Sequence, residues 1–189
     1  RDYLARRQLT AQTVTRFGLG FAPDTWDSLV RAMKALGYSE QELFDGGLVR
    51  HGRSGGVYDT FRNRLMFPVI DVRGNVIGFS GRILGDGEPK YMNSPETIVF
   101  SKSHNLFALN LAKKSKCGYI ILAEGNIDVA SLHQAGFDSA VASLGTSLTP
   151  EQARLLSRYT SEIVIAYDND GAGQKASQRA IGILEKLEV

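Results

Sequence analysis

Hydrophobic residues recur with helical spacing in the first part of the chain. The apolar positions of Trp26–Leu36 fall on one face of a helix. Thr10 and Ser39 stand where two further helices would begin, and Glu42 completes a capping box with Ser39. We therefore predict that residues 1–45 are mainly helical.

The pattern changes after residue 48, where glycines, arginines and short runs of β-branched residues alternate. Two of these runs, 65–70 and 76–79, are predicted strands, and the segment 71–75 between them contains an Arg-Gly pair that favours a hairpin turn. We expect an antiparallel or mixed sheet here, followed by a helix at about 105–114.

The last third of the chain alternates short, wholly apolar runs with amphipathic segments. The expected strands are 119–123, 140–142 and 163–166, and the expected helices are 127–135, one that begins at Pro150 after the cap Thr149, and 172–187. Three strand–helix repeats with apolar strands favour a parallel sheet covered on both faces. The expected fold class is an α+β segment followed by an α/β sheet, with the junction near 115–118.

The composition is that of an ordinary globular protein, with 43% hydrophobic and 22% charged residues among 189. The apolar runs are too short to span a membrane and no secretion leader is recognisable, so we expect a cytoplasmic protein with no membrane partner. The single cysteine, Cys117, excludes an internal disulfide, and three scattered histidines give no zinc site. Because the chain begins with Arg1, we expect a piece of a longer protein.

Charge is distributed unevenly, although the formal net charge is only +2. Residues 1–49 are balanced, residues 50–116 carry 11 basic and 5 acidic side chains, and residues 117–189 carry 5 basic and 9 acidic ones. A basic segment followed by an acidic one suggests a surface for a polyanion and a site that holds cations. Two solvated faces would give the same pattern, so charge alone leaves the question open.

Acidic residues follow two of the three strands predicted in the last third. Glu124 comes directly after the first strand, Asp168 and Asp170 follow the third, and Asp128 stands one turn into a helix. Because the carboxyl ends of parallel strands meet at one edge of a sheet, we expect these acids to lie together. Oxygen ligands without His or Cys favour Mg²⁺ or Mn²⁺. Helix caps and turns are the alternative explanation for these acids.

Two nucleotide- or metal-binding motifs are excluded by their spacing. The acidic loop begins like a calcium-binding EF-hand, but Ala172 and Arg179 occupy its fifth and twelfth positions, where oxygen ligands are required. The chain also lacks a G-x-x-x-x-G-K-[ST] run, so it is not a P-loop NTPase.

Basic residues gather around the strands predicted in the middle of the chain. Arg62 and Arg64 flank Asn63, and alternate residues of an extended chain point to the same face. Further residues suited to contact phosphates or to stack on bases are Arg82, Lys90, Tyr91, Asn93 and Lys102. The alternative is a solvated basic edge of the sheet.

Six segments carry a resemblance to a known family. They are Tyr58–Pro68, Ile77–Arg82, Pro89–Thr97, Glu124–Asp128, Ser143–Thr146 and Tyr167–Gly173. In this order they resemble the catalytic core of bacterial replicative DNA primases of the DnaG type, the last three being similar to its Toprim motifs. The similarity extends from Gly18–Pro23 to the last predicted helix. Six ordered segments make a specific resemblance.

The resemblance implies that residues 1–116 form the basic N-terminal subdomain of a primase core and residues 117–189 a Toprim subdomain that is incomplete at its C-terminus. It implies synthesis of short RNA primers by metal-dependent nucleotidyl transfer, with Glu124, Asp168 and Asp170 as catalytic metal ligands and Asp128 as a further ligand. The implied partners are single-stranded DNA, ribonucleoside triphosphates, the RNA primer and, through a domain absent from this chain, the replicative helicase.

Two other functions share some of these features. Another Toprim enzyme, a topoisomerase or nuclease, would have the acids but cut strands, and a non-catalytic nucleic-acid-binding module would not need a metal. The primase-like basic segments favour the first interpretation. The family usually has an aromatic residue where Asn126 stands and often a glycine where Asn169 stands, although neither position supplies a ligand.

Overall fold

The computed structural model describes residues 2–53, 55–145 and 147–187. Contacts within the chain group the residues into two units, each made of separate segments. Unit 1 consists of Arg1–Phe17, Val69–Val76 and Lys102–Val189, and unit 2 of Gly18–Pro68 and Ile77–Ser101. The segments interleave because the hairpin of β4 (Arg64–Ile70) and β5 (Val76–Ile83) contributes its tip to unit 1.

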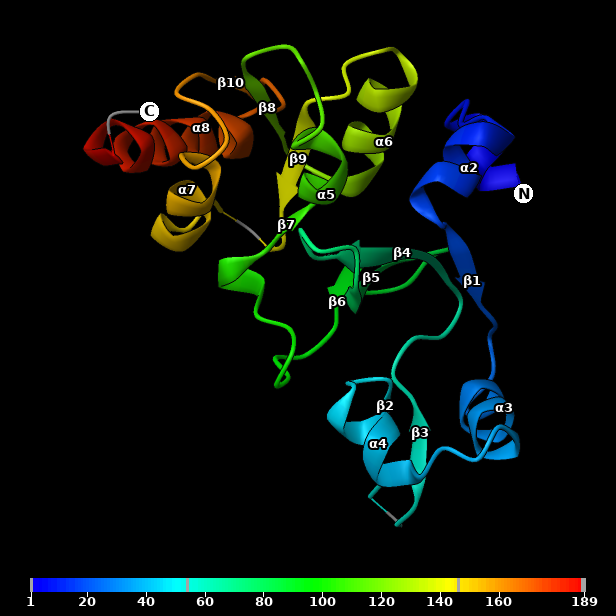
Figure 1. Cartoon of the computed structure of the whole chain (residues 1–189). Helices are drawn as coiled ribbons and strands as arrows, with labels where there is room; N and C mark the ends of the chain where they lie inside the picture. The colour runs from blue at the N-terminus through cyan, green and yellow to red at the C-terminus, as the bar shows by residue number, and fades with distance from the viewer. Residues whose placement is uncertain (1, 54, 146, 188–189) are drawn as a thin grey trace. The chain divides into compact units, whose positions relative to one another are not determined.

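Unit 1 is built on a four-stranded sheet in the order β10-β8-β9-β7 (Figure 1). β8 (Ile120–Ala123), β9 (Ala140–Ser143) and β10 (Ile163–Ala166) are parallel, which confirms the three predicted strands. The short β7 (Leu106–Phe107) pairs with β9 in the antiparallel direction. The sheet is therefore mixed, with a parallel centre.

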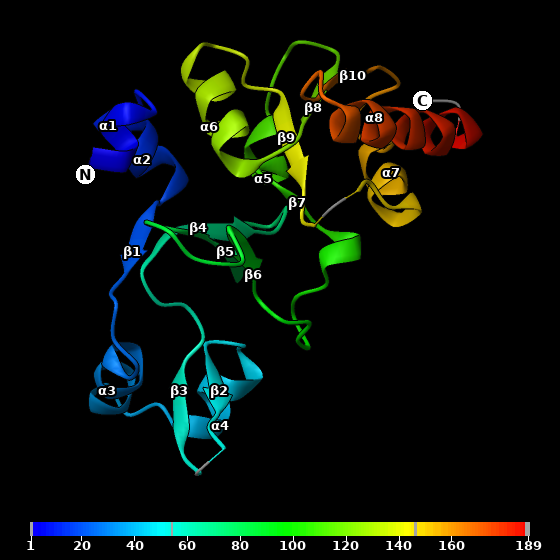
Figure 2. The same cartoon turned by 180° about the vertical axis from the view of Figure 1, so that it is seen from behind.

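Helices lie on both sides of this sheet. α6 (Asn126–Gln134) lies on one side, and α7 (Pro150–Leu156) and α8 (Gly171–Leu184) lie on the other (Figures 1 and 2). η2 (Glu185–Leu187) continues α8. The fully buried Leu122, Val141 and Leu156 belong to the apolar core that the sheet shares with α7 and α8. β10 departs from the expected two-sided coverage, because it forms an edge of the sheet and its Val164 is 43% exposed.

The N-terminal helices of unit 1 follow the predicted pattern. α1 (Asp2–Arg6) precedes α2 (Ala11–Phe17), where Thr10 Oγ1 accepts a hydrogen bond from the Thr13 N–H. Phe17 at the end of α2 lies edge-on to His133 of α6 and stacks with Phe107. These aromatic contacts pack α2 against α6.

The helix predicted at 105–114 is wrong in its first half. The segment contains the single turn η1 (Lys102–His104), then β7, and only afterwards the short α5 (Leu109–Ala112). Ala108 adopts a left-handed conformation with φ 65°, which separates strand from helix. The apolar pair of β7 is 2% exposed at each residue, because it extends the sheet instead of forming a helical face.

Unit 2 contains a sheet in the order β1-β4-β5-β6, with β1 (Gly20–Ala22) and β6 (Tyr91–Asn93) at its edges. β1 is antiparallel to β4, and β6 is antiparallel to β5. The predicted turn between β4 and β5 is present. Asp71 Oδ1 accepts hydrogen bonds from the backbone N–H groups of Arg73 and Asn75, both at 2.9 Å. These bonds hold the pKa of Asp71 below its usual value.

A small cluster of helices and a hairpin completes unit 2. Its elements are α3 (Ser28–Ala35), α4 (Glu40–Asp45), β2 (Val49–His51) and β3 (Val57–Asp59). The capping box of Ser39 and Glu42 is confirmed at the start of α4. The buried Asp59 accepts hydrogen bonds from the N–H groups of Leu29 and Val30 and so ties β3 to α3.

No helix in the described ranges is both long and apolar enough to cross a membrane.

Candidate metal and nucleic-acid sites

The carboxyl ends of β8 and β10 meet at one edge of the unit 1 sheet. Ala123 lies opposite Ala166, so Glu124 and the pair Tyr167-Asp168 leave the sheet side by side. The backbone N–H of Asp168 donates a hydrogen bond of 3.2 Å to Glu124 Oε2. Two of the predicted acidic residues are therefore in contact, as the strand order requires. We call this region, with Asp128 and Asp170, the acidic edge.

Asp170 caps α8. Its Oδ1 accepts hydrogen bonds from the N–H groups of Ala172 at 3.0 Å and Gly173 at 2.7 Å. The loop is tightly closed, because a Cβ atom on Gly173 would lie 2.0 Å from the carbonyl oxygen of Asp168. Capping, which the sequence left open as an alternative, is thus observed for Asp170, and it fixes the carboxylate at the start of α8.

Asp128 lies in the first turn of α6, where its Oδ2 accepts a hydrogen bond of 3.0 Å from the Gly125 N–H. Neighbouring protein atoms remove water from this carboxylate and raise its pKa, and the negative charge of Asp168 acts in the same direction. The Gly125 hydrogen bond and the positive charge of Arg7 oppose the rise. The charges of Asp168 and Arg7 therefore both affect the pKa of Asp128, in opposite directions.

Sequence reasoning did not single out Arg7. It stands in a short polar segment between two helices, and no periodicity or spacing connects it with acids more than a hundred residues away. The signal appears only in three dimensions, through its charge at Asp128. Arg7 also lies over the Tyr3 ring, 5.7 Å from the ring centre.

The donor chemistry of the acidic edge fits a hard divalent cation. Carboxylate oxygens are the ligands that Mg²⁺ and Mn²⁺ prefer, and the edge offers four of these groups. Among residues 2–53, 55–145 and 147–187, however, no three His, Cys, Asp or Glu side chains are grouped closely enough to hold an ion as they stand. The acids share one edge of the sheet, but their convergence on one ion remains a prediction.

Other residues near this edge show what surrounds the acids. Burial, together with the negative charge of Glu124, raises the pKa of Tyr167 to about 12, so its hydroxyl stays protonated near neutral pH. Asn126 is buried at the start of α6. Asn169 Oδ1 accepts a hydrogen bond of 3.0 Å from Gln174 Nε2. Thr146 of the fifth primase-like segment lies outside the described residues.

In unit 2, Arg62 lies against two aromatic rings. Its Cζ is 3.9 Å from the centre of the Trp26 ring and 5.3 Å from that of Tyr58. Its Nη1 donates a hydrogen bond of 2.7 Å to the carbonyl of Asp59. Trp26 is 64% exposed, so this cation–π pair lies at the surface. No pattern in the sequence pairs Arg62 with Trp26, because helical periodicity already accounted for Trp26.

Arg64 differs from the exposed basic residue that alternation predicted. It is 4% exposed, and its Nη1 donates hydrogen bonds to the carbonyls of Gly81 and Pro89, both at 3.0 Å. Burial and the charge of Arg62 lower the pKa of Arg64. The alternation argument does not apply to this pair, because β4 begins only at Arg64 and Arg62 lies in the preceding loop.

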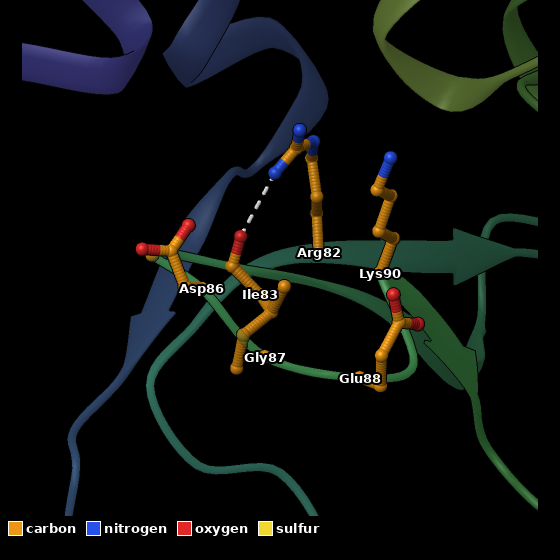
Figure 3. A pocket seen from close by; sticks show the side chains of 7 residues that line it. Arg82, Ile83, Asp86, Gly87, Glu88 and Lys90 are labelled. Carbon is orange, nitrogen blue, oxygen red and sulfur yellow. Dashed lines mark hydrogen bonds between the residues drawn. The ribbon is translucent and has the colours of Figure 1, made fainter.

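Arg82 and Lys90 border one pocket of unit 2. Figure 3 shows their side chains extending to the same side, while the acids Asp86 and Glu88 project from the loop between them. The other lining residues are Ile83, Gly85 and Gly87. Arg82 Nη1 donates a hydrogen bond of 2.9 Å to the Ile83 carbonyl. The paired cations suit an anionic group.

Two more predicted residues, Tyr91 and Asn93, lie on β6, which pairs with the strand that carries Arg82. β5 and β6 are in register so that Arg82 faces Tyr91 and Ser80 faces Asn93. The Arg82 Cζ lies 5.6 Å from the centre of the Tyr91 ring, and Tyr91 is 43% exposed. Lys102 belongs to η1 in unit 1. The structure therefore groups Arg82, Lys90, Tyr91 and Asn93 within one unit.

Comparison with known families gives two matches. Residues 1–113 match the family described as DNA primase catalytic core, N-terminal domain, and residues 121–189 match the family described as Toprim-like. Together these ranges cover nearly the whole chain, and the first alone covers more than half of it.

One curated relative and two solved structures show how far the similarity extends. The DNA primase of Clostridium acetobutylicum is 51% identical over 187 residues, which are 98% of this chain and 31% of that protein. The E. coli primase catalytic core is 43% identical with a TM-score of 0.87, over 96% of this chain and 58% of that one. A DnaG primase catalytic domain bound to single-stranded DNA is 42% identical with a TM-score of 0.84, over 96% and 59%. The chain spans about a third of the length of the curated relatives it matches.

Proposed function

The chain belongs to the DNA primase catalytic-core family, and from this membership we propose that it performs the nucleotidyl transfer by which a primase makes short RNA primers on single-stranded DNA. The observation that carries the proposal is the acidic edge. Its residues fall within the Toprim-like match, and Glu124 and Asp168 are in contact there. The domain division proposed with it is a basic subdomain at 1–116 and a Toprim subdomain at 117–189.

Metal dependence is a property of the Toprim primase family, and we propose Mg²⁺ or Mn²⁺ as the ion in this chain. Glu124, Asp168 and Asp170 would hold it, with Asp128 as a further ligand. When bound, the ion would stabilise the negative charge that develops on a triphosphate during transfer. The cap on Asp170 and the hydrogen bond on Glu124 fix two of these carboxylates before any ligand arrives.

The protein's own residues orient the reactants. Arg82 and Lys90 present two cations at one pocket, which suits the phosphates of a template strand or a nucleotide. Tyr91, opposite Arg82, offers an exposed ring on which a base can stack, and Asn93 lies two residues further along the same strand. Arg62 supplies a further cation, and Lys102 another in unit 1. The similar DnaG catalytic domain that is bound to single-stranded DNA supports single-stranded DNA as the template.

Arg64 has a different part in this proposal. Because its guanidinium is buried and bonded to the carbonyls of Gly81 and Pro89, it supports the loop that ends at Lys90. We therefore assign Arg64 to holding the phosphate-binding loop in place, and the direct contacts to Arg62, Arg82 and Lys90.

The remaining partners follow from the same family membership. We propose ribonucleoside triphosphates and the growing RNA primer as ligands, and the replicative helicase as a partner that is contacted through regions found in full-length primases. A cytoplasmic location is part of the proposal, since the relatives are primases of bacteria, whose chromosomes lie in the cytoplasm.

A chimaera tests the proposed activity. This chain replaces the matching segment of the Clostridium acetobutylicum primase, so that the rest of a full-length primase is present. We expect template-dependent incorporation of ribonucleotides on single-stranded DNA. Glu124→Gln should abolish incorporation. Glu162→Gln should retain it, because Glu162 precedes β10, at the opposite end of the strand from Asp168.

Two results would contradict the proposal. Cleavage of the template in place of incorporation would assign a Toprim nuclease. Binding of single-stranded DNA without incorporation, while the parent primase is active in the same assay, would assign a non-catalytic binding module.

A further inference from the structure

Gln152, in the first turn of α7, contacts the turn that carries Lys102. Gln152 is 1% exposed. The amide oxygen accepts a hydrogen bond of 3.0 Å from the Thr149 N–H, and the amide nitrogen donates two hydrogen bonds of 2.8 Å, to the carbonyls of Lys102 and Asn105. Both ends of the amide are therefore engaged, and its two donors reach residues about fifty positions earlier in the chain.

The two ends of this amide serve different purposes. The oxygen of Gln152 closes the capping box of α7 with Thr149, a role that a glutamate performs equally well. The nitrogen has no part in the cap. A glutamate at this position would keep the box but would bring carboxylate oxygens against the carbonyls of Lys102 and Asn105. Helix capping therefore accounts for the hydrogen bond of Gln152 Oε1 but not for the two hydrogen bonds of Nε2.

The start of α7 makes several hydrogen bonds to the turn that Nε2 contacts. η1 comprises only Lys102–His104, and an isolated 3₁₀ turn of this length has poor hydrogen-bond geometry of its own. Thr149 Oγ1 adds a hydrogen bond of 2.6 Å to the Ser103 carbonyl. The start of α7 thus bonds to three carbonyls in the segment 102–105, two within the turn and one directly after it.

We propose that Gln152 is a positioning residue, which fixes the backbone of the turn so that the Lys102 side chain is presented to a phosphate group of nucleic acid or of a nucleoside triphosphate. The inference rests on the proposed function, which takes Lys102 as a phosphate contact. A lysine has a long and flexible stem, so a fixed backbone reduces the conformational entropy that it loses on binding. The carbonyl that Gln152 holds is unaffected by side-chain substitutions of Lys102, so the two residues can be changed independently.

A double-mutant cycle on the full 189-residue chain tests the inference. The probe is a labelled 16-nucleotide oligothymidylate, and its affinity is measured against salt concentration. Lys102→Gln removes one cation and should lower the slope of log affinity against log salt by about 0.7. Gln152→Met keeps the length of the side chain without its hydrogen bonds and should reproduce roughly half of that loss or more. The double variant should lose no more than Lys102→Gln alone.

Controls separate positioning from a general loss of stability. Leu156→Val destabilises the same helix through the core and should leave the salt slope unchanged. If Gln152→Met does not fold, Gln152→Glu replaces it, because it preserves the capping box. Its added negative charge is matched by Arg158→Gln, which lowers the net charge equally at an exposed position just beyond α7. Gln152→Glu should weaken binding more than this control, and the excess should vanish in the Lys102→Gln background.

Each contrary outcome has its own meaning. A folded Gln152 variant with the wild-type slope, beside a reduced slope in Lys102→Gln, overturns the positioning role and leaves the phosphate contact intact. Additive losses in the double variant overturn it as well, since the two residues would then act separately. An unchanged slope in Lys102→Gln overturns the phosphate contact itself, and the positioning role falls with it.

Discussion

Asp168 and Glu124 are joined by a hydrogen bond that the backbone N–H of Asp168 donates to the Glu124 carboxylate over 3.2 Å. Because the donor is a main-chain group, this bond persists when the side chain at position 168 is changed. It also ties the ends of two neighbouring parallel strands, β8 and β10, at the edge where the other acids lie. A change from carboxylate to amide at Asp168 therefore alters charge while this contact remains.

The packing of α8 on the acidic loop gives a stability prediction. A Cβ atom on Gly173 would lie 2.0 Å from the Asp168 carbonyl oxygen, so Gly173→Ala must push α8 away from the loop. We expect a loss of about 1–3 kcal/mol in the free energy of unfolding, as for other overpacked sites, together with weaker Mn²⁺ binding. Chemical denaturation and calorimetry measure the two effects.

Gly182 in the same helix is the matched control. Among the described residues a Cβ atom there would meet nothing within 4 Å, and Gly182 lies in the last turn of α8, which η2 continues. Gly182→Ala should therefore raise stability by about 0.5–1 kcal/mol through helix propensity alone. A Gly173→Ala protein as stable as Gly182→Ala would show that the close approach of α8 to Asp168 does not exist.

His133 gives a pH dependence of stability. Its Nε2 lies 2.9 Å from the Ala140 carbonyl, which can only accept, so Nε2 carries the proton. The buried Nδ1 has no hydrogen-bond partner in the part of the chain that the structure describes. Burial lowers the pKa of His133, and the charge of Arg16 acts in the same direction, against the Ala140 hydrogen bond and Asp138. The unfolded chain therefore binds this proton more readily than the folded one.

It follows that the stabilising effect of neutral His133 is complete above the unfolded pKa, about 6.5, and declines as the pH falls below it. We expect the urea midpoint to decrease between about pH 7 and about pH 5. His133→Gln, whose amide can still donate to Ala140, should show a smaller decrease. An equal decrease in both proteins would show that His133 does not contribute to the acid sensitivity.

Arg82 gives a prediction for the basic pocket. Loss of one phosphate contact in Arg82→Ala should lower the salt slope of single-stranded DNA binding by about 0.7, to a similar extent for different sequences. Because an arginine stem also packs, thermal melting must show that the variant folds. Arg31→Ala, an exposed arginine of α3 paired with Asp27 at the surface, should leave the slope unchanged. If Arg82→Ala, like Arg31→Ala, keeps the wild-type salt slope, Arg82 does not contact a phosphate.

The strands and capped helices were predictable because their signals are local. Thr149 and Gln152 mark the start of α7, and the apolar run before Glu124 marks β8, from nearest-neighbour chemistry alone. β7 was not predictable, since Leu106 and Phe107 suit a helix or a strand equally. Their pairing with β9, which follows more than thirty residues later, decided between the two.

The residue types of the site were predictable, but the individual roles of the basic side chains were not. Alternation grouped Arg62 with Arg64, but it does not predict where the strand begins. β4 begins at Arg64, whose guanidinium is buried, whereas Arg62 lies before the strand and packs on the Trp26 ring. Likewise, Arg7 reaches Asp128 only through tertiary packing. Acids that follow parallel strands are better predicted, because the sheet itself brings the strand ends together.

Calorimetric titration of Mn²⁺ into the wild-type chain and the Asp168→Asn variant tests the proposed metal centre most directly. Glu162→Gln, which removes the same charge before the other end of β10, is the matched control. We predict that Asp168→Asn weakens Mn²⁺ binding on the order of tenfold or more, that Glu162→Gln binds like the wild type, and that the metal-free Asp168→Asn protein is at least as stable because repulsion among the acids is relieved. An Asp168→Asn protein that binds Mn²⁺ with the affinity and stoichiometry of the wild type would contradict the assignment of the acidic edge as the metal site.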